Sequence, residues 1–375
     1  MDEDFAYEIS LIAELPGHED RAWHIAWNPT KPILASCSSD KTVRLYGYIP
    51  SADNFNFLTS IPTGHTKTVR SIAWAPSGNT LATASFDSNV GIWEREDGEE
   101  WECVSLLEGH ETECKSVGYS STGTLLASCS RDKSVWVWEG VSRGNALFIH
   151  AFTIDLPRSL ESSTIHFGTA AFCSISFFLD SSPILIHTYH LVQPDADFEC
   201  LGVIMEHSQD VKCVAWHPTE EILASGSYDD TIKLYVDDPE DDWFCCATLT
   251  GHKSTVWALA WSPNGQYLAS GSDDKTVLVL EGHERPVYSV SWGKGKGAGV
   301  GWLASAGGDG VIRVWELAEQ SAGGLLEHRM IAKLESAHDV YDLNAVVWCP
   351  RDGLEDTLAT AGDDGICKVW KLTPR

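Results

Sequence analysis

The sequence predicts an all-β fold, a seven-bladed β-propeller whose N-terminal strand closes the last blade. Three observations lead to this prediction. One set of polar and aromatic residues recurs seven times along the 375 residues. Runs of alternating apolar residues, typical of half-buried strands, are bounded by the turn-forming residues Gly, Pro, Asn and Asp. Residues 6–15 resemble an outer strand that precedes the first repeat, whereas the sequence stops soon after the third strand of the last repeat.

Each repeat is marked by an Asp in a turn. A Ser or Thr stands four residues before this Asp, and a Trp or Tyr stands six residues after it in six of the repeats. A His lies upstream, 22 residues before the Asp in the first five repeats. In repeats 1 to 7 the His and Asp pairs are His18 and Asp40, His65 and Asp87, His110 and Asp132, His207 and Asp229, His252 and Asp274, His283 and Asp309, and His338 and Asp364. This set, recurring about every 40–45 residues, is the signature of WD40 repeats, in which each repeat builds a blade.

Histidine and aspartate pairs are also the raw material of catalytic sites. Here each pair recurs once per repeat at a fixed spacing, so we interpret the His, Ser or Thr, Asp and aromatic residues as a structural tetrad. Their hydrogen bonds would tie the strands of a blade together, at a net gain of about 1 kcal/mol each. We expect no catalytic residues, because no further cluster of His, Asp or Glu stands outside the repeats.

Repeat 2 shows how a blade is built. Residues 69–74 form a strand, a Pro-Ser-Gly-Asn turn follows, and residues 80–85 and 90–93 form the next two strands. The fourth strand is marked by Trp101, Phe198 or Trp243, each nine residues before the next His. Seven such units account for nearly the whole chain, so residues 1–375 are predicted to be one domain.

The period fails twice. About 50 extra residues precede Phe198, and residues 141–194 carry only five charges, which is unusual for a surface loop. We interpret residues 141–197 as a non-native or disordered insertion between the third and fourth strands of repeat 3; a membrane helix in residues 162–179 is an alternative that its Ser, Thr, Gly and His residues disfavour. In repeat 5, Leu280 replaces the aromatic residue and only two residues separate it from His283. We therefore expect that repeat 5 lacks its fourth strand.

The charge of the chain limits its partners. With 54 acidic and 26 basic residues the formal net charge is −28, which disfavours binding to nucleic acid or to an anionic membrane surface. The first residues lack the basic and apolar regions of a signal peptide. The eleven Cys residues include no pair spaced for a metal, so we expect reduced thiols, no metal and no cofactor in a cytoplasmic or nuclear protein.

Four segments are closer to one family than to WD40 proteins in general. Residues 130–139, 227–235, 241–249 and 251–257 resemble the WD40 subunit of the cytosolic iron–sulfur protein assembly targeting complex. The resemblance covers all repeats except at residues 141–197 and at the junction after Leu280. It implies a non-catalytic adaptor in cytoplasm and nucleus that docks a HEAT-repeat adaptor subunit, a small cluster-delivery subunit and iron–sulfur apo-proteins. It also implies that some apo-proteins are recognised by a C-terminal tail with an acidic and an aromatic residue.

The predicted binding surface is the top face, where the turns before the repeat Asp residues lie. Two positions per repeat would ring this face: the residue before the Asp, and the residue at the start of the innermost strand. The candidate partner-binding residues at these positions are Trp23, Arg70, Phe86, Lys115, Arg131, Lys212, Tyr228, Trp257 and Tyr288. Arginine suits carboxylates and aromatic residues act as anchors, so an acidic-aromatic peptide with a free carboxylate would fit.

Two other interpretations remain open. Trp23 and Trp257 could simply fill the centre of the ring, while Arg131 pairs with a neighbouring acid. The chain could also be a substrate receptor or scaffold of another complex, such as a ubiquitin ligase, although such chains usually carry a recruiting segment before the propeller, which here begins near residue 6.

Overall fold

The structure is a computed structural model that describes residues 5–52, 54–95, 99–142, 196–238, 242–277, 282–296, 299–319 and 326–375. Over these ranges the chain consists of strands, turns and loops. They hold no helix, and hence none with the length and apolar character needed to cross a membrane. The strands belong to one compact unit, Met1–Val141 together with Ala196–Arg375.

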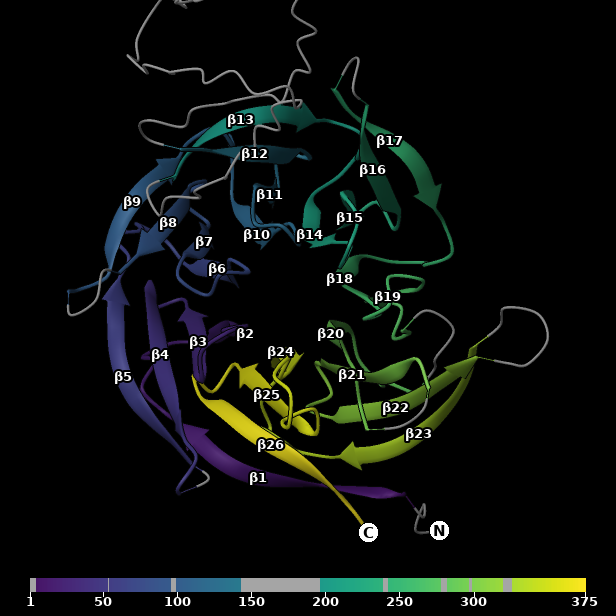
Figure 1. Cartoon of the computed structure of the whole chain (residues 1–375). Coiled ribbons are helices and arrows are strands. Elements are labelled where there is room, and N and C mark those ends of the chain that lie inside the picture. The colour runs from purple at the N-terminus through teal and green to yellow at the C-terminus, as the bar shows by residue number, and fades with distance from the viewer. Residues whose placement is uncertain are drawn as a thin grey trace, which may run out of the picture. The chain divides into compact units, whose positions relative to one another are not determined.

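Five four-stranded antiparallel sheets follow the order of the chain. The first two are β2 (Ala22–Trp27), β3 (Ile33–Ser38), β4 (Thr42–Ile49) and β5 (Asn54–Pro62), then β6 (Val69–Trp74), β7 (Leu81–Ser85), β8 (Val90–Glu94) and β9 (Glu102–Leu107). The next two are β10 (Cys114–Tyr119), β11 (Leu125–Ser130), β12 (Val135–Ser142) and β13 (Ala196–Ile204), then β14 (Val211–Trp216), β15 (Ile222–Ser227), β16 (Ile232–Asp238) and β17 (Asp242–Leu249). The fifth is β20 (Val287–Gly293), β21 (Gly301–Gly307), β22 (Ile312–Glu319) and β23 (Leu326–Leu334). In each, the first strand lies nearest the centre of the ring (Figure 1).

A sixth four-stranded sheet joins the two ends of the chain. It contains β24 (Leu343–Trp348), β25 (Thr357–Gly362), β26 (Cys367–Pro374) and, on its outer side, β1 (Tyr7–Leu15). β1 runs antiparallel to β26 from the pair Tyr7–Pro374 to the pair Leu15–Cys367 (Figure 1). The prediction that the N-terminal strand completes the last blade is confirmed.

Repeat 5 forms a smaller sheet. It has two strands in the structure, β18 (Val256–Trp261) and β19 (Leu268–Ser272), and a single bridge joins Gly271 to Val277. Leu280 and the rest of the expected third strand lie outside the described residues, and β20 of repeat 6 follows at Val287.

The strands on either side of the long segment in repeat 3 are neighbours in one sheet. β12 is the third strand of its sheet and β13 the fourth, so the segment between them connects neighbouring strands. Residues 141–142 belong to β12 and residues 196–197 to β13, so the expected segment 141–197 overlaps the ends of both strands. Residues 143–195, including the run 162–179, lie outside the described residues.

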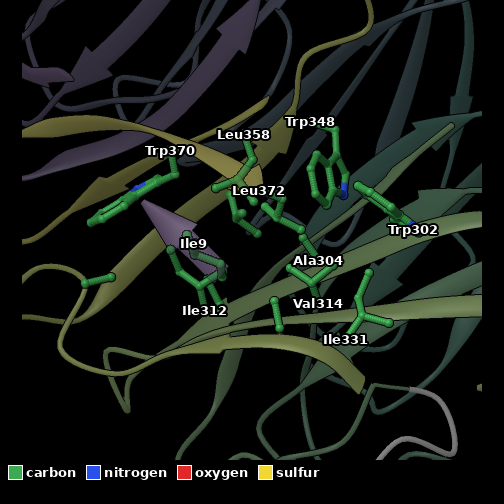
Figure 2. Close-up of a cluster of buried hydrophobic side chains, with 14 of the residues drawn as sticks. Ile9, Trp302, Ala304, Ile312, Val314, Ile331, Trp348, Leu358, Trp370 and Leu372 are labelled. Carbon is green, nitrogen blue, oxygen red and sulfur yellow. The ribbon is translucent and has the colours of Figure 1, made fainter. Parts of the chain in front are cut away.

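The core lies between neighbouring sheets. Between repeats 6 and 7, Trp302, Trp348 and Trp370 pack with aliphatic side chains from both sheets, and Ile9 of β1 reaches into the same cluster (Figure 2). Burying a side chain such as Ile9 stabilises the fold by about 1.5–3 kcal/mol, so the strand that closes the ring also completes its core. A Cβ atom on Gly293 would lie 2.6 Å from Cγ of Trp348, so the indole leaves room only for glycine there.

Candidate binding site on the top face

The hydrogen bonds from the tetrad His to the Asp and to the Ser or Thr are present in all seven repeats. Each His uses Nδ1 for the Asp carboxylate, at 2.8–3.0 Å, and Nε2 for the Ser or Thr hydroxyl, at 2.6–2.9 Å. The indole Nε1 of Trp93, Trp138 and Trp370 donates to the same hydroxyl, and the phenol of Tyr235 lies 3.0 Å from it. Both ring nitrogens of every repeat His therefore form hydrogen bonds within their own repeat, one to the Asp and one to the Ser or Thr.

Repeat 6 contains a substitution that sequence reasoning missed. In repeats 1, 4 and 5 a Thr two residues after the Asp donates its hydroxyl to the carboxylate, but in repeat 6 this position is Val311. Arg313, only 4% exposed, takes its place: Nη1 lies 3.0 Å from the carboxylate of Asp309, and Nη2 donates to the carbonyl of Gly282. The signal in the sequence was the apolar residue two positions after the Asp, followed by an Arg two residues further on.

These contacts shift the ionisation of the repeat residues. Burial alone would raise the pKa of Asp229, but hydrogen bonds from Thr231 and His207 lower it to about 2. Burial would likewise raise the pKa of Asp274. Hydrogen bonds from the Thr276 side chain, the Lys253 backbone and the His252 side chain outweigh this effect and lower the pKa to about 2. Burial lowers the pKa of His207 and outweighs the raising effect of Asp229.

We expect the chain to lose stability in acid in two stages. An unfolded His has a pKa near 6.5 and takes up a proton before the buried His207 does, so the free energy of unfolding falls as the pH drops below about 6.5. Asp229 and Asp274 stabilise the fold above their unfolded pKa of about 3.9, and this contribution is lost between about pH 4 and pH 2. Urea unfolding from pH 8 to pH 3 measures both stages; a free energy of unfolding that stays constant down to pH 4 would contradict the first.

On the top face, the cationic candidates converge from three repeats. Burial lowers the pKa of Lys115, and the nearby charges of Lys212 and Arg70 lower it further, although a hydrogen bond to Glu113 opposes them. Arg131 is 58% exposed at the side chain and lies 3.6 Å from Glu113, while Lys212 lies 3.1 Å from Asp210. We call Arg70, Lys115, Arg131 and Lys212 the basic arc. Its four cations face two carboxylates.

Arg70 differs from the rest of the basic arc. Its guanidinium carbon lies 4.7 Å above the centre of the Trp23 ring, and burial lowers its pKa. In the described part of the chain no carboxylate forms an ion pair with it. Arg70 is thus a partly buried cation without a counter-ion among the described residues.

Four of the aromatic candidates each contact one cation of the basic arc, as Trp23 does with Arg70. Lys115 Nζ lies 4.0 Å from the ring centre of Phe86. Lys212 Nζ lies 5.3 Å from Tyr228 and 5.0 Å from Trp257, whose ring meets Tyr288 edge to face at 5.7 Å. The nine candidate residues therefore do come together, in contacting groups around the inner side of the top face, with Arg131 joined to them through Glu113.

The other side of the ring carries the opposite charge. Burial raises the pKa of Tyr288, and the carboxylates of Asp342, Asp273 and Asp363 raise it further, so these three acids converge on one ring. We call them the acidic arc. Asp273 accepts a hydrogen bond from Nε1 of Trp257 at 2.7 Å, and Asp363 lies 3.4 Å from the guanidinium of Arg21. Asp342 is missing from the sequence prediction because it stands directly before the innermost strand β24, a position that the prediction did not use.

Within the described ranges no three His, Cys, Asp or Glu side chains are grouped to hold a metal ion. The buried thiols are also poor ligands and nucleophiles, because burial raises the pKa of Cys213 and Cys367 to about 12. The top face presents the cations of the basic arc, several aromatic rings and the carboxylates of the acidic arc.

Four-stranded sheets around a ring, each carrying the His, Ser or Thr, Asp and aromatic set, define a WD40-repeat β-propeller. The family described as "WD domain, G-beta repeat" matches residues 9–47, 56–94, 101–139, 198–235, 243–279, 277–316 and 330–371. Within this class the chain belongs to the family of the cytosolic iron–sulfur protein assembly protein 1, which confirms the resemblance seen in its sequence.

Three relatives carry this assignment. "Probable cytosolic iron-sulfur protein assembly protein 1" of Cryptococcus neoformans is 37% identical over 97% of this chain and 99% of its own length. The protein of the same name from Yarrowia lipolytica is 37% identical over 97% of this chain and 100% of its own length. "Probable cytosolic iron-sulfur protein assembly protein Ciao1" of Culex quinquefasciatus is 36% identical over 97% and 98%.

Proposed function

We propose that the chain is a non-catalytic adaptor whose top face binds the C-terminal tail of a partner protein through the tail's carboxylates. The observation that carries this proposal is Arg70. A partly buried charge that has no counter-ion among the described residues is costly in apolar surroundings, and an anionic ligand would relieve that cost. Lys115 adds positive charge at the same place, since its charge interacts both with that of Arg70 and with that of Lys212.

The aromatic residues supply the second half of the recognition. Trp257, Tyr228 and Phe86 each contact a cation of the basic arc and stay partly or largely open to solvent, Tyr228 being 55% exposed. Aromatic side chains bury much area at little entropic cost and dominate binding energies at interfaces. A tail with one acidic and one aromatic residue and a free terminal carboxylate matches both features.

The relatives suggest the pathway in which this adaptor acts. Their names place them in cytosolic iron–sulfur protein assembly, and they match this chain over nearly its full length. We propose the same role here: the chain joins a HEAT-repeat adaptor subunit and a small cluster-delivery subunit, and presents iron–sulfur apo-proteins to them in cytoplasm and nucleus. The structural role of the tetrads and the absence of catalysis belong to this proposal.

The proposal also includes the form of the ring. We propose that the two-stranded sheet β18–β19 is the fifth of seven blades, shortened on its outer side, and that residues 1–375 form one domain interrupted by an insertion. The support is that repeat 5 has a complete His, Ser and Asp set: His252 lies 2.8 Å from Asp274 and 2.7 Å from Ser270.

Arg131→Glu is the test of the binding surface. We expect this variant to fold normally, because Arg131 is exposed, and to bind a fluorescent peptide ending in Asp-Trp about 30-fold or more weakly, because a cation becomes an anion beside Glu113. Lys31→Glu makes the same charge change in the turn between β2 and β3 and should bind like the wild type. Unchanged binding by Arg131→Glu would move the site elsewhere on the propeller.

The pathway needs its own test. Purification of the tagged chain from cell extract, followed by mass spectrometry, should recover the iron–sulfur targeting subunits and apo-proteins. Recovery of ubiquitin-ligase subunits in their place would contradict the proposed role.

A further inference from the structure

We propose that the top face binds its peptide in one direction, with the C-terminal carboxylate on the basic arc and a cationic side chain from an upstream residue in a pocket beside Gly308. This inference rests on the proposed function and adds to it a second subsite and a polarity. It comes from four observations: a pocket, the reason it is hollow, its charge, and its connection to the basic arc.

The pocket lies on the top face between repeats 6 and 7 and has a volume of about 450 Å³. Its walls come from three loops: Glu284 and Arg285 precede β20, Gly308 lies in the turn between β21 and β22, and Asp339 to Tyr341 precede β24. A volume of this size accommodates one or two side chains of a peptide.

Two departures from the repeat make the pocket hollow. At the position before the repeat Asp, repeat 6 alone has glycine, where the other repeats place Ser39, Phe86, Arg131, Tyr228, Asp273 and Asp363. The loop from His338 to Leu343 is one residue longer than its counterparts, and it projects Val340, which is 90% exposed, and Tyr341, which is 48% exposed. The pocket therefore has an apolar wall on one side and an open floor at Gly308.

The charge of the pocket selects a cation. Glu284 and Asp339 are both exposed on its rim, and Asp342 stands behind Gly308, 3.3 Å from where a Cβ atom would lie. The single cation of the wall, Arg285, is already engaged, because Nη1 donates to the carbonyl of Gly308 at 3.2 Å and lies 3.7 Å from Asp342. Carboxylates thus outnumber cations, and a Lys or Arg side chain could lay its aliphatic stem along Val340 with its charge among the acids.

The pocket is continuous with the basic arc. The Cβ position of Gly308 lies 3.4 Å from the ring of Tyr288, Tyr288 contacts Trp257, and Trp257 contacts Lys212. A peptide that places its carboxylate near Lys212 and continues over these two rings reaches the pocket after about four to six residues, at about 3.3 Å per extended residue. The opposite direction would bring the carboxylate to the acidic arc, where repulsion disfavours it.

The test compares three fluorescent decapeptides that end in Asp-Trp with a free carboxylate and carry Lys, Ala or Glu at the fourth to sixth residues from the end. We expect the wild-type chain to bind the Lys peptide about five-fold or more tightly than the Ala peptide, and the Glu peptide most weakly. The double variant Glu284→Gln, Asp339→Asn removes both rim charges at nearly constant size. It should bind all three peptides with the affinity that the wild type has for the Ala peptide. Asn suits residue 339, where φ is 54°.

The outcomes distinguish failure of the cationic subsite from failure of the proposed tail-binding function. If the wild type binds the three peptides equally while Arg131→Glu loses them all, the upstream subsite is wrong and the proposed function stands. If the wild type binds none of the three, both fail. If the Lys preference is present but survives in the double variant, the cationic residue is held elsewhere and the pocket beside Gly308 is not its site.

Discussion

Replacing Asp132 by Ala will lower the free energy of unfolding of the chain by about 3 kcal/mol or more. The carboxylate of Asp132 accepts hydrogen bonds from the backbone N–H of Glu111 at 3.0 Å and of Ser134 at 2.9 Å, and it also contacts the Ser134 hydroxyl and Nδ1 of His110. Its loss leaves several of these donors without an acceptor, and each buried donor left unpaired costs about 1–3 kcal/mol. Urea unfolding followed by tryptophan fluorescence measures the change.

Glu111→Ala is the matched control for this variant. Glu111 lies next to His110, is exposed, and contributes only its backbone N–H to the tetrad, so its side chain should matter by less than about 0.5 kcal/mol. If Asp132→Ala lowers the free energy of unfolding by less than 1 kcal/mol, the hydrogen bonds of the repeat residues do not stabilise the blades as proposed.

Arg70→Leu will separate binding from stability. We expect the variant to bind a peptide ending in Asp-Trp about 50-fold more weakly than the wild type, because the guanidinium that meets the carboxylate is gone. Its free energy of unfolding should stay within about 1 kcal/mol of the wild type, because the lost stacking on Trp23 is offset by removal of a buried charge without a counter-ion.

Arg70→Lys is the companion variant, and it should recover part of the affinity, since it keeps the charge but lacks the planar fork that pairs with a carboxylate. Fluorescence anisotropy gives both affinities, and urea unfolding gives the stabilities. If Arg70→Leu unfolds easily but binds normally, Arg70 is a structural residue and the carboxylate site is elsewhere.

Asp132 and the strand β1 show what the sequence could predict. Asp132 belongs to a set that recurs at fixed spacing, and a recurring set means the same local geometry each time, so the hydrogen bonds to His110 and Ser134 could be expected before the structure. The strand that closes the ring followed from the unpaired residues 6–15, and β1 pairs with β26 as expected.

Contacts between repeats were beyond the sequence. The order of the inner ring could be inferred, but the stacking of Arg70 on Trp23 joins residues 47 positions apart on different sheets. The contact of Lys212 with Trp257 joins residues 45 positions apart, also on different sheets. The pocket at Gly308 was missed for another reason. It arises where a side chain is missing and a loop is one residue longer, and neither change alters the pattern of strands.

The unequal charge of the inner ring connects these features with the overall acidity of the chain. With a net charge of −28, the protein repels anions at long range, so the proposed binding of an acidic tail depends on the local positive charge of the basic arc. Salt should therefore weaken tail binding without abolishing it, because part of the site is buried and aromatic.

The most direct test of the central claim is the affinity of the wild-type chain for one peptide in two forms, ending in Asp-Trp with either a free carboxylate or a terminal amide. Isothermal titration calorimetry at physiological salt gives both dissociation constants. If the top face recognises a C-terminal carboxylate, the free acid binds in the micromolar range or tighter and the amide binds about ten-fold or more weakly. Equal affinities for the two forms, or no binding of the free acid, would contradict the account.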